Sequence, residues 1–265
     1  MGLLTPVEGD QEVRTFVMSD AHGHPELIKN ALDHGGFRQG EDAFVYAGDL
    51  LDRGPDPAGC IELVDRYATE VLFGNHELGM MLDFDVYPRT MESFACRQAL
   101  FDRILDADPQ SAWKAATCIE GVLVTHAGVS SKYEPVFHEE CGGDVRLLAA
   151  YLNRSFMAAV RRKLETGGWE EDGILGDGGP TWFRPVPYSS LEPLLGLRQV
   201  VGHTSPIPVL EEAGFYMVDP CVWMGVEDRG RFRYAVIEDG RVRVEEGTLA
   251  PLGGRTPGPV EALCR

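Results

Sequence analysis

Five short apolar runs in this sequence each end in residues that can ligate a metal ion or move a proton. The first is followed by Asp20-Ala21-His22 and the second by Asp49-Leu50-Leu51-Asp52-Arg53. The third is followed by Asn75-His76-Glu77, and the last two are followed by His126 and His203. Carboxylate, amide and imidazole groups suit divalent Mn, Fe or Zn better than a metal that prefers thiolates. A single histidine would be read as structural, but five such endings indicate one metal site.

The same residues include groups suited to phosphate chemistry. Two cations about 3.5–4 Å apart can hold a hydroxide between them and clamp the phosphoryl oxygens. A carboxylate in the middle of the set is the best bridge between two such ions. The guanidinium of Arg53 has a planar fork that matches phosphate oxygens, and the ring of His76 can titrate near neutral pH. The pattern therefore predicts metal-assisted hydrolysis of a phosphate ester.

The apolar runs that precede these residues predict buried strands, because they are short and rich in Val and Phe. They are Arg14–Met18, Ala43–Ala47, Val71–Phe73, Val122–Val124 and Gln199–Val201. Polar residues just past such strands converge on one edge of a sheet, which is where α/β proteins place their sites. This arrangement would bring together residues that lie far apart in the chain.

Helices are expected between the strands. Pro25–His34 opens with proline, which is a good first helical residue, and Pro57–Thr69 has apolar residues at helical spacing. Two longer helical insertions are expected at about 78–116 and 144–166.

The last part of the chain is predicted to be β-rich. Strands are expected at Phe215–Val218, Tyr234–Ile237 and Val242–Val244, and Asp239-Gly240 is a favoured hairpin turn. We interpret residues 1–265 as one domain with a poorly ordered C-terminal tail at about 251–265.

The composition is that of an acidic α/β protein and argues against several partners. The chain has 265 residues, 44% of them hydrophobic, and a net charge of −18. An acidic surface does not attract nucleic acid or an anionic membrane, and no run of 18 apolar residues is present to span a bilayer. Six scattered cysteines without a Cys-x-x-Cys pair fit reduced thiols. With no signal peptide at the N-terminus, these features predict a cytoplasmic protein of unknown oligomeric state.

The motifs resemble those of the calcineurin-like metallophosphoesterases, and within them the phosphoprotein phosphatase group. The family motifs GD-x-HG, GD-x-x-DRG, GNHE, H-[GA]-G and a late GH correspond to Ser19–Gly23, Gly48–Gly54, Gly74–Glu77, His126–Gly128 and Gly202-His203. They run from Asp20 to His203, which is 184 of the 265 residues. The resemblance implies an α/β fold of the metallophosphoesterase type, an αββα sandwich of two mixed sheets with helical insertions.

The resemblance also implies a ligand set for two divalent metal ions. Asp20, His22 and Asp49 would hold the first ion. Asp49, Asn75, His126 and His203 would hold the second, so that Asp49 bridges the two. Manganese is the expected metal, with iron or zinc as alternatives.

The catalytic roles implied by the resemblance fall on four further residues. A hydroxide that bridges the metals would attack phosphorus directly, without a covalent enzyme intermediate. His76, oriented by Asp52, would protonate the leaving oxygen. Arg53 would bind the phosphate. Arg184 is the candidate for a second phosphate-binding arginine, because bacterial members often carry a Trp-x-Arg element such as Trp182-Phe183-Arg184.

The substrate class stays open between two possibilities. Ser19 stands where the phosphoprotein phosphatases usually have Gly, and Ala127 stands where the eukaryotic protein phosphatases have Gly. His-Ala-Gly is more familiar from bacterial members and from symmetrical diadenosine tetraphosphate hydrolases. The first expectation is a bacterial-type Ser/Thr phosphatase, with dual specificity for phosphotyrosine as its wider form, acting on phosphorylated protein or a small phosphoester. The alternative is a symmetrical dinucleoside polyphosphate hydrolase.

A third alternative is a catalytically silent scaffold that merely keeps the fold. The joint presence of every ligand, the acid and Asp52 argues against it. Other polar residues near the motifs are given no chemistry. Glu77 is expected to support the turn, His24 is expected not to ligate, and Asp219 is interpreted as structural.

Overall fold

The computed structural model describes residues 13–105, 113–168, 173–221 and 230–249, and its strands form two sheets. The larger sheet has the order β10-β9-β1-β2-β3-β4. Its strands are β1 (Thr15–Met18), β2 (Ala43–Tyr46), β3 (Glu70–Leu72), β4 (Trp113–Lys114), β9 (Arg231–Glu238) and β10 (Arg241–Thr248). Strands β1 to β4 pair in parallel, whereas β9 runs antiparallel to both β1 and β10.

The smaller sheet has the order β5-β6-β7-β8. Its strands are β5 (Ala116–Ile119), β6 (Val122–Thr125), β7 (Gln199–Val201) and β8 (Phe215–Met217). β6, β7 and β8 pair in parallel, and β5 is antiparallel to β6. Both sheets are therefore mixed, as predicted.

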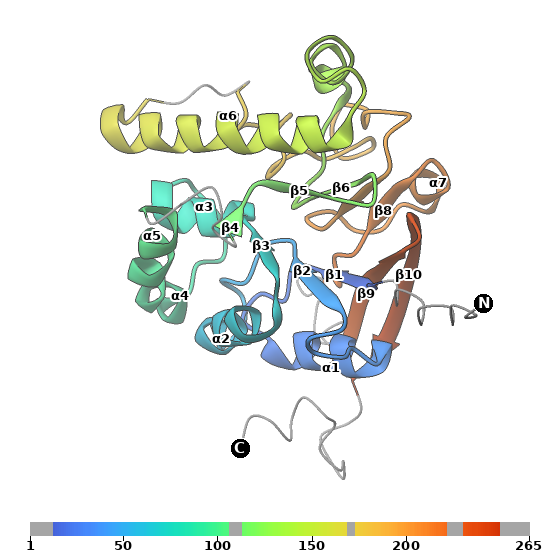
Figure 1. Cartoon of the computed structure of the whole chain (residues 1–265). Coiled ribbons are helices and arrows are strands. Elements are labelled where there is room, and N and C mark those ends of the chain that lie inside the picture. The colour runs from blue at the N-terminus through green and yellow to red at the C-terminus, as the bar shows by residue number, and fades with distance from the viewer. Residues whose placement is uncertain (1–12, 106–112, 169–172, 222–229, 250–265) are drawn as a thin grey trace, which may run out of the picture.

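The two sheets pack face to face, and helices cover their outer faces (Figure 1). Helices α1 (Pro25–Gly35) and α2 (Pro57–Tyr67) lie against the larger sheet, and the long helix α6 (Val145–Thr166) lies over the smaller one. This is the predicted αββα layering. Because side chains alternate along a strand, Phe16 of β1 packs into the cluster that includes α1, whereas Val17 packs against the second sheet.

The layer between the sheets is built from small and medium-sized apolar residues, most of them Val. Val17, Val45 and Leu72 of the larger sheet meet Val124 and Val200 of the smaller one, and all five are fully buried. Strands with both faces covered carry continuous apolar residues, which explains why the five runs preceding the candidate ligands were recognisable from the sequence.

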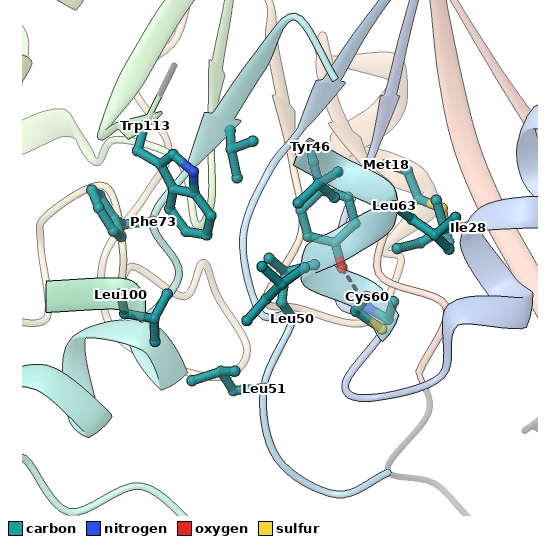
Figure 2. Packing of buried hydrophobic residues seen from close by; sticks show 14 of the residues in the cluster. Met18, Ile28, Tyr46, Leu50, Leu51, Cys60, Leu63, Phe73, Leu100 and Trp113 are labelled. Carbon is teal, nitrogen blue, oxygen red and sulfur yellow. Dashed lines mark hydrogen bonds between the residues drawn. The ribbon is translucent and has the colours of Figure 1, made fainter. Parts of the chain in front are cut away.

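Helices α3 (Asn75–Leu82), α4 (Met91–Ala95) and α5 (Arg97–Leu105) occupy about half of the first predicted insertion. The structure differs from the prediction at the C-terminal end of this insertion, because β4 and the first residue of β5 fall inside the range 78–116. β4 has only two residues, too few to show a strand period in the sequence. It is fixed by pairing with β3 and by packing of Trp113 on Phe73, whose ring centroids are 5.1 Å apart (Figure 2).

The remaining elements are short. A 3₁₀ turn at Ser131–Tyr133, a π-helical turn at Val136–Glu140 and helix α7 (Pro208–Glu212) lie in the connections. The predicted turn at Asp239-Gly240 joins β9 to β10, with φ of 53° and 64° at its two residues. The predicted tail at about 251–265 lies outside the described residues.

Two further expectations concern the whole chain. The five cysteines in the described ranges are all free. None of the helices in those ranges combines the length and the apolar character needed to cross a bilayer.

Candidate metal centre

The candidate ligands lie at the carboxyl ends of five strands that come from both sheets. Asp20 and His22 follow β1, Asp49 follows β2 and Asn75 follows β3. His126 follows β6 and His203 follows β7. Within each sheet these strands run parallel to one another, so their carboxyl ends meet at one edge of the sandwich.

The loops after these strands hold an unusual concentration of left-handed backbone. Within the described ranges, ten residues other than glycine have positive φ. Six of them belong to the candidate site: Asp20, His22, Asp49, Asp52, Arg53 and His203. Such conformations cost roughly 1–3 kcal/mol each and persist where the surroundings enforce them, which is common at functional sites.

Close approach between the loops explains two glycines of the motifs. A Cβ atom at Gly74 would overlap Oδ1 of Asp49, and a Cβ atom at Gly202 would overlap Oδ2 of Asp20. These positions are glycine because a ligand carboxylate occupies the space of their missing side chains.

The ligating atoms form two groups that share Asp49. His22, Asp49 and His76 make one group, and Asp49, His126 and His203 make the other, with the atoms of each group within 4.8 Å of one another. Oδ2 of Asp49 lies 3.4 Å from Nε2 of His22 and 3.5 Å from Nε2 of His126. Asp49 therefore lies between two sets of imidazoles, as expected of a bridging carboxylate.

The hydrogen bonds of the imidazoles turn their lone pairs toward this centre. Nδ1 of His22 donates to the carbonyl of Leu51 at 2.6 Å, and Nδ1 of His126 donates to the carbonyl of Ala47 at 2.8 Å. Because Nδ1 carries the proton in each ring, Nε2 is an acceptor. Both Nε2 atoms thus face the carboxylate of Asp49, so that hydrogen-bond acceptors lie opposite one another.

The same polarity continues around the second group. Oδ1 of Asn75, another acceptor, lies 3.1 Å from Nε2 of His126, whereas Nδ1 of His203, 3.2 Å from the same atom, can donate a hydrogen bond to it. Nε2 of His22 and Nε2 of His203 are buried without a hydrogen-bond partner. Buried acceptors that face one another need a cation between them, so the donor set fits divalent metal ions.

Asp20 connects the two groups. Its Oδ2 accepts the backbone N–H of His203 at 3.0 Å, and its Oδ1 is 3.8 Å from Nε2 of His22. The carboxylate is 2% exposed. It therefore lies beside the first group and fixes the loop that carries a ligand of the second.

Burial shifts the pKa values of the histidines and of Asp49 in opposite directions. Burial lowers the pKa of His22 and of His203 well below the ordinary value, which keeps both rings neutral. Burial raises the pKa of Asp49 to about 8. Metal ions displace protons from their ligands, so a cation would restore the charged form of Asp49.

A second cluster of titratable groups borders the metal ligands. Nδ1 of His76 donates to Oδ2 of Asp52 at 2.7 Å, and Nη2 of Arg53 lies 3.3 Å from Nε2 of His76. The rings of His22 and His76 meet edge to face with centroids 4.7 Å apart. The structure thus brings the predicted acid, its orienting carboxylate and the predicted phosphate-binding arginine to the edge of the first metal group.

This geometry agrees with the similarity to known proteins. A family model described as calcineurin-like phosphoesterase matches residues 13–158. That range holds more than half of the 265 residues and includes every candidate metal ligand except His203. The chain belongs to the calcineurin-like phosphoesterase family.

Curated relatives of this phosphoesterase fall into two substrate classes. Serine/threonine-protein phosphatase 1 of Salmonella typhimurium is 34% identical over 71 residues, which are 27% of this chain and 33% of that protein. The symmetrical bis(5'-nucleosyl)-tetraphosphatase of Proteus mirabilis is 22% identical over 142 residues, 51% of each protein. The matches span only a third to a half of the length of these relatives.

Solved structures support the fold. A cold-active protein-tyrosine phosphatase from a psychrophilic Shewanella superposes with a TM-score of 0.59 at 17% identity, covering 91% of this chain and 81% of that one. A protein serine/threonine phosphatase from Saccharomyces cerevisiae gives a TM-score of 0.56 at 14% identity, covering 92% and 82%. At these identities the likeness concerns the fold alone.

Arg184 lies beside the phosphoesterase centre and contacts it through the main chain. Its Nη1 donates to the carbonyl of His203 at 2.6 Å. The neighbouring Trp182 places its ring 6.1 Å from the ring of His203. The Trp-x-Arg element therefore packs against His203, and the phosphate-binding role of Arg184 stays a prediction.

Glu77 has more partners than the sequence indicated. Its carboxylate is fully buried and accepts the backbone N–H groups of Asp49, Leu50, Leu51 and Gly74 at 2.8, 2.8, 3.2 and 2.9 Å. It thereby joins the loop after β2 to the start of α3, consistent with the expected support of the turn. His24 instead contacts Glu26 at 3.1 Å, away from the two metal groups.

Sequence reasoning missed three residues that hold the loops in place. The hydroxyl of Tyr46 accepts the N–H of Ala21 at 2.8 Å and lies 3.4 Å from the carbonyl of Asp49, where it can donate. Thr90 and Ser93 both contact Asp52. Tyr46 reads as a core residue at the end of an apolar run, and the other two lie in an insertion with no motif around them.

Asp219 is also closer to the centre than its structural interpretation suggested. The carboxylate is 2% exposed and accepts the N–H of Cys221 at 2.7 Å. Burial, followed by the charge of Asp20, raises its pKa to about 8. A cation at the centre would favour the charged form of this carboxyl.

Proposed function

We propose that the chain is a dinuclear metal-dependent phosphoesterase that hydrolyses phosphomonoesters. The observation that carries the proposal is the pair of metal-binding groups sharing Asp49, with the His76–Asp52 pair and Arg53 at its border. A structural metal site would not need a titratable pair and a guanidinium beside it.

The proposed ligands combine members of these two groups with Asp20 and Asn75, whereas His76 is assigned to proton transfer because its Nδ1 donates to Asp52. One ion would be held by Asp20, His22 and Asp49, and the other by Asp49, Asn75, His126 and His203. Two such ions, when bound, neutralise charge on the phosphate and activate water for attack. Manganese is the proposed metal, and iron and zinc suit the same donor set.

The chain's own groups act on the phosphate and on the leaving group. Arg53 and Arg184 would bind the phosphate oxygens. Nε2 of His76 accepts from Arg53 in the structure. With Arg53 turned to the phosphate, His76 would hold a proton at Nε2 and transfer it to the leaving oxygen, while Asp52 accepts from Nδ1 and stabilises the charged ring. The 2.7 Å contact between Nδ1 and Oδ2 supports this division of roles.

Phosphorylated Ser or Thr in a protein is the preferred substrate class, with phosphotyrosine as the wider form. A pocket of about 420 Å³ beside Trp182 is lined by Asp83, Asp85 and Asp177 together with Lys163. Since Trp182 contacts His203, this pocket adjoins the centre. Three carboxylates against one ammonium disfavour a long polyphosphate chain at this rim.

A symmetrical dinucleoside tetraphosphate is the second candidate substrate. It is supported by the match to the Proteus mirabilis tetraphosphatase, which extends over 142 residues, twice the length of the match to the Salmonella phosphatase. At 22% identity over half of each protein, that match carries no information specific to the rim of the site. We therefore rank it below the phosphomonoester.

Three substrates assayed side by side test the proposal. p-Nitrophenyl phosphate, a phosphoserine peptide and diadenosine tetraphosphate are supplied in turn with Mn²⁺, Fe²⁺ or Zn²⁺, and again with EDTA. We expect EDTA-sensitive hydrolysis of the first two, with Mn²⁺ the best activator. Faster turnover of the tetraphosphate than of the peptide would favour the second candidate, and no metal-dependent hydrolysis of any substrate would refute the phosphoesterase proposal.

A further inference from the structure

Helix α4 buries a single residue, and that residue is polar. Met91, Glu92, Phe94 and Ala95 are exposed, whereas Ser93 is fully buried. A helix that only completed the core would place an apolar side chain at its buried position. A buried hydroxyl is costly unless it is hydrogen-bonded, so the partners of Ser93 indicate what α4 contributes.

Those partners lie on Asp52, 41 residues earlier in the chain. Oγ of Ser93 accepts the backbone N–H of Asp52 at 2.8 Å. The backbone N–H of Thr90 donates to Oδ1 of Asp52 at 3.2 Å. The hydroxyls of Thr90 and Ser93 are themselves 2.8 Å apart, so the two residues form one connected support.

Asp52 needs such support because its backbone is strained. Asp52 and Arg53 are consecutive residues with φ of 68° and 63°, a conformation that L side chains adopt only where their surroundings enforce it. Within the turn, the carbonyl of Asp52 accepts the N–H of Gly54 at 2.7 Å. From outside the turn, Oγ of Ser93 fixes the N–H of Asp52 by accepting its hydrogen bond.

The carboxylate of Asp52 is fixed at both of its oxygens. Oδ2 contacts Nδ1 of His76 at 2.7 Å, and Oδ1 is held by Thr90. Arg53, the next residue, reaches Nε2 of the same ring at 3.3 Å. A shift of the Asp52 backbone would therefore move both groups that contact His76.

We propose that Ser93 is a positioning residue, which acts through Asp52 to hold His76 and Arg53 in register with the leaving group. This inference rests on the proposed function, because it assigns His76 to protonation of that group. Helix α4 then helps to fix the positions of the groups that contact His76.

The test compares Ser93→Ala with the unchanged enzyme on a poor and a good leaving group. Phenyl phosphate needs protonation of its leaving oxygen more than p-nitrophenyl phosphate does. With Mn²⁺ present, we expect kcat to fall about tenfold on phenyl phosphate and about twofold on p-nitrophenyl phosphate, a fraction of what a general acid contributes. A loss of folded protein would lower both rates by the same factor.

Cys96→Ala is the matched control for a weakened helix. Cys96 is buried at the C-cap of α4, and its substitution should leave the ratio of the two rates unchanged. If Ser93→Ala does not fold, Ser93→Cys keeps the branching of the side chain, with a slightly larger volume, and replaces the hydroxyl with a weaker acceptor. It should move the ratio in the same direction.

A second readout does not need activity. The His76 Nδ1–H proton should give a downfield NMR resonance, assigned by its disappearance in His76→Asn. We expect Ser93→Ala to shift or broaden it and Cys96→Ala to leave it in place. Equal rate losses on both substrates, or an unchanged resonance, would overturn the inference. An enzyme inactive on both substrates would refute the proposed function instead, while the resonance would still test the link from Ser93 to His76.

Discussion

The side chains of the proposed metal centre present lone pairs to one another inside a buried site. Nε2 of His22 and Nε2 of His126 both face Oδ2 of Asp49, at 3.4 and 3.5 Å. Without a cation, such contacts cost desolvation and give no hydrogen bond in return. Tightly packed loops hold these side chains together. The metal-free chain is therefore less stable than it would be with apolar residues here, but its site is already shaped for metal.

His76→Asn tests the acid at the border of this site. If His76 protonates the leaving oxygen, kcat on phenyl phosphate should fall by about two to four orders of magnitude. The loss on p-nitrophenyl phosphate should be smaller, because nitrophenolate leaves with little protonation. Asp52→Asn should show the same trend at smaller size, since Asp52 acts only through the ring.

Metal content provides the control for these two variants. His76 and Asp52 are not among the proposed ligands, so both variants should bind as much Mn²⁺ as the unchanged chain by elemental analysis. Equal losses on the two substrates, or a loss of metal, would show that His76 is a ligand or a structural residue.

Glu77→Gln tests the carboxylate that joins two of the ligand loops. Four backbone N–H groups point at Glu77, and an amide offers them a single oxygen. We expect the free energy of unfolding of the metal-free chain, measured in urea, to fall by about 2–4 kcal/mol. Glu92→Gln on the exposed face of α4 is the control and should change it little. A similar small change in both variants would mean that water replaces the lost bonds.

The residues of the centre were predictable where a motif held several polar groups after a strand. Asp49, Asp52 and Arg53 stand within one turn, and the type and spacing of these residues point to phosphate chemistry. Tyr46 and Ser93 were not predictable, because their partners lie 25 and 41 residues away. A lone hydroxyl carries no periodicity, and only the folded chain shows which backbone group it meets.

At the scale of elements, the site depends on how β1 and β2 are aligned. These strands carry Asp20 and Asp49 at their ends, and a shift of one strand along the other would separate the two carboxylates. The alignment is set at the opposite end by Asp42, which accepts from Arg14 at 2.7 Å and from Arg38 at 3.1 Å. The backbone N–H of Ala43 also donates to the carbonyl of Arg14 at 2.9 Å.

Asp42→Asn should reveal this alignment through its pH dependence. Burial raises the pKa of Asp42, but hydrogen bonds from Arg14 and Arg38 outweigh it and hold the pKa below its ordinary value of 3.8. A depressed pKa stabilises the folded state above that value, and the contribution is lost as the pH falls below about 4. We expect the variant to cost about 1–2 kcal/mol at pH 7 and much less at pH 3.

Urea unfolding at both pH values measures the effect. Arg38 is 46% exposed at its side chain, so added salt should reduce part of the loss. Glu62→Gln on the exposed face of α2 should show no such pH dependence. If Asp42→Asn lowers the free energy of unfolding equally at pH 3 and pH 7, Asp42 acts by its shape and not by its charge.

The elements that were predicted well are those with both faces covered. β1, β2, β6 and β7 are continuous apolar runs, and the fold places them in the middle of the layers. The edge strand β4 was missed, because two residues show no period. β9 and β10 extend beyond their predicted ranges, since charged residues such as Arg231 and Glu246 lie on exposed positions that a search for apolar runs passes over.

On the scale of the whole molecule, the proposed metals would join the two sheets. Asp20, Asp49 and Asn75 come from the larger sheet, whereas His126 and His203 come from the smaller one. The sheets otherwise meet through a layer of small apolar side chains such as Val17 and Val200. Ions shared between their edges would add a second, polar connection.

Removal of metal should therefore weaken the whole sandwich and not one loop. A ligand that binds only the folded state adds about 2.7 kcal/mol at a hundred times its Kd. For a chain of this size that corresponds to a rise in Tm of roughly 5–10 °C. We expect Mn²⁺ to raise Tm by this amount over EDTA-treated protein, and hydrogen exchange to slow in β1, β2, β6 and β7 alike. Asp49→Asn, which removes the shared ligand, should lose most of both effects.

Protection confined to one sheet would contradict the cross-sheet arrangement, and a Tm indifferent to EDTA would contradict the metal centre itself.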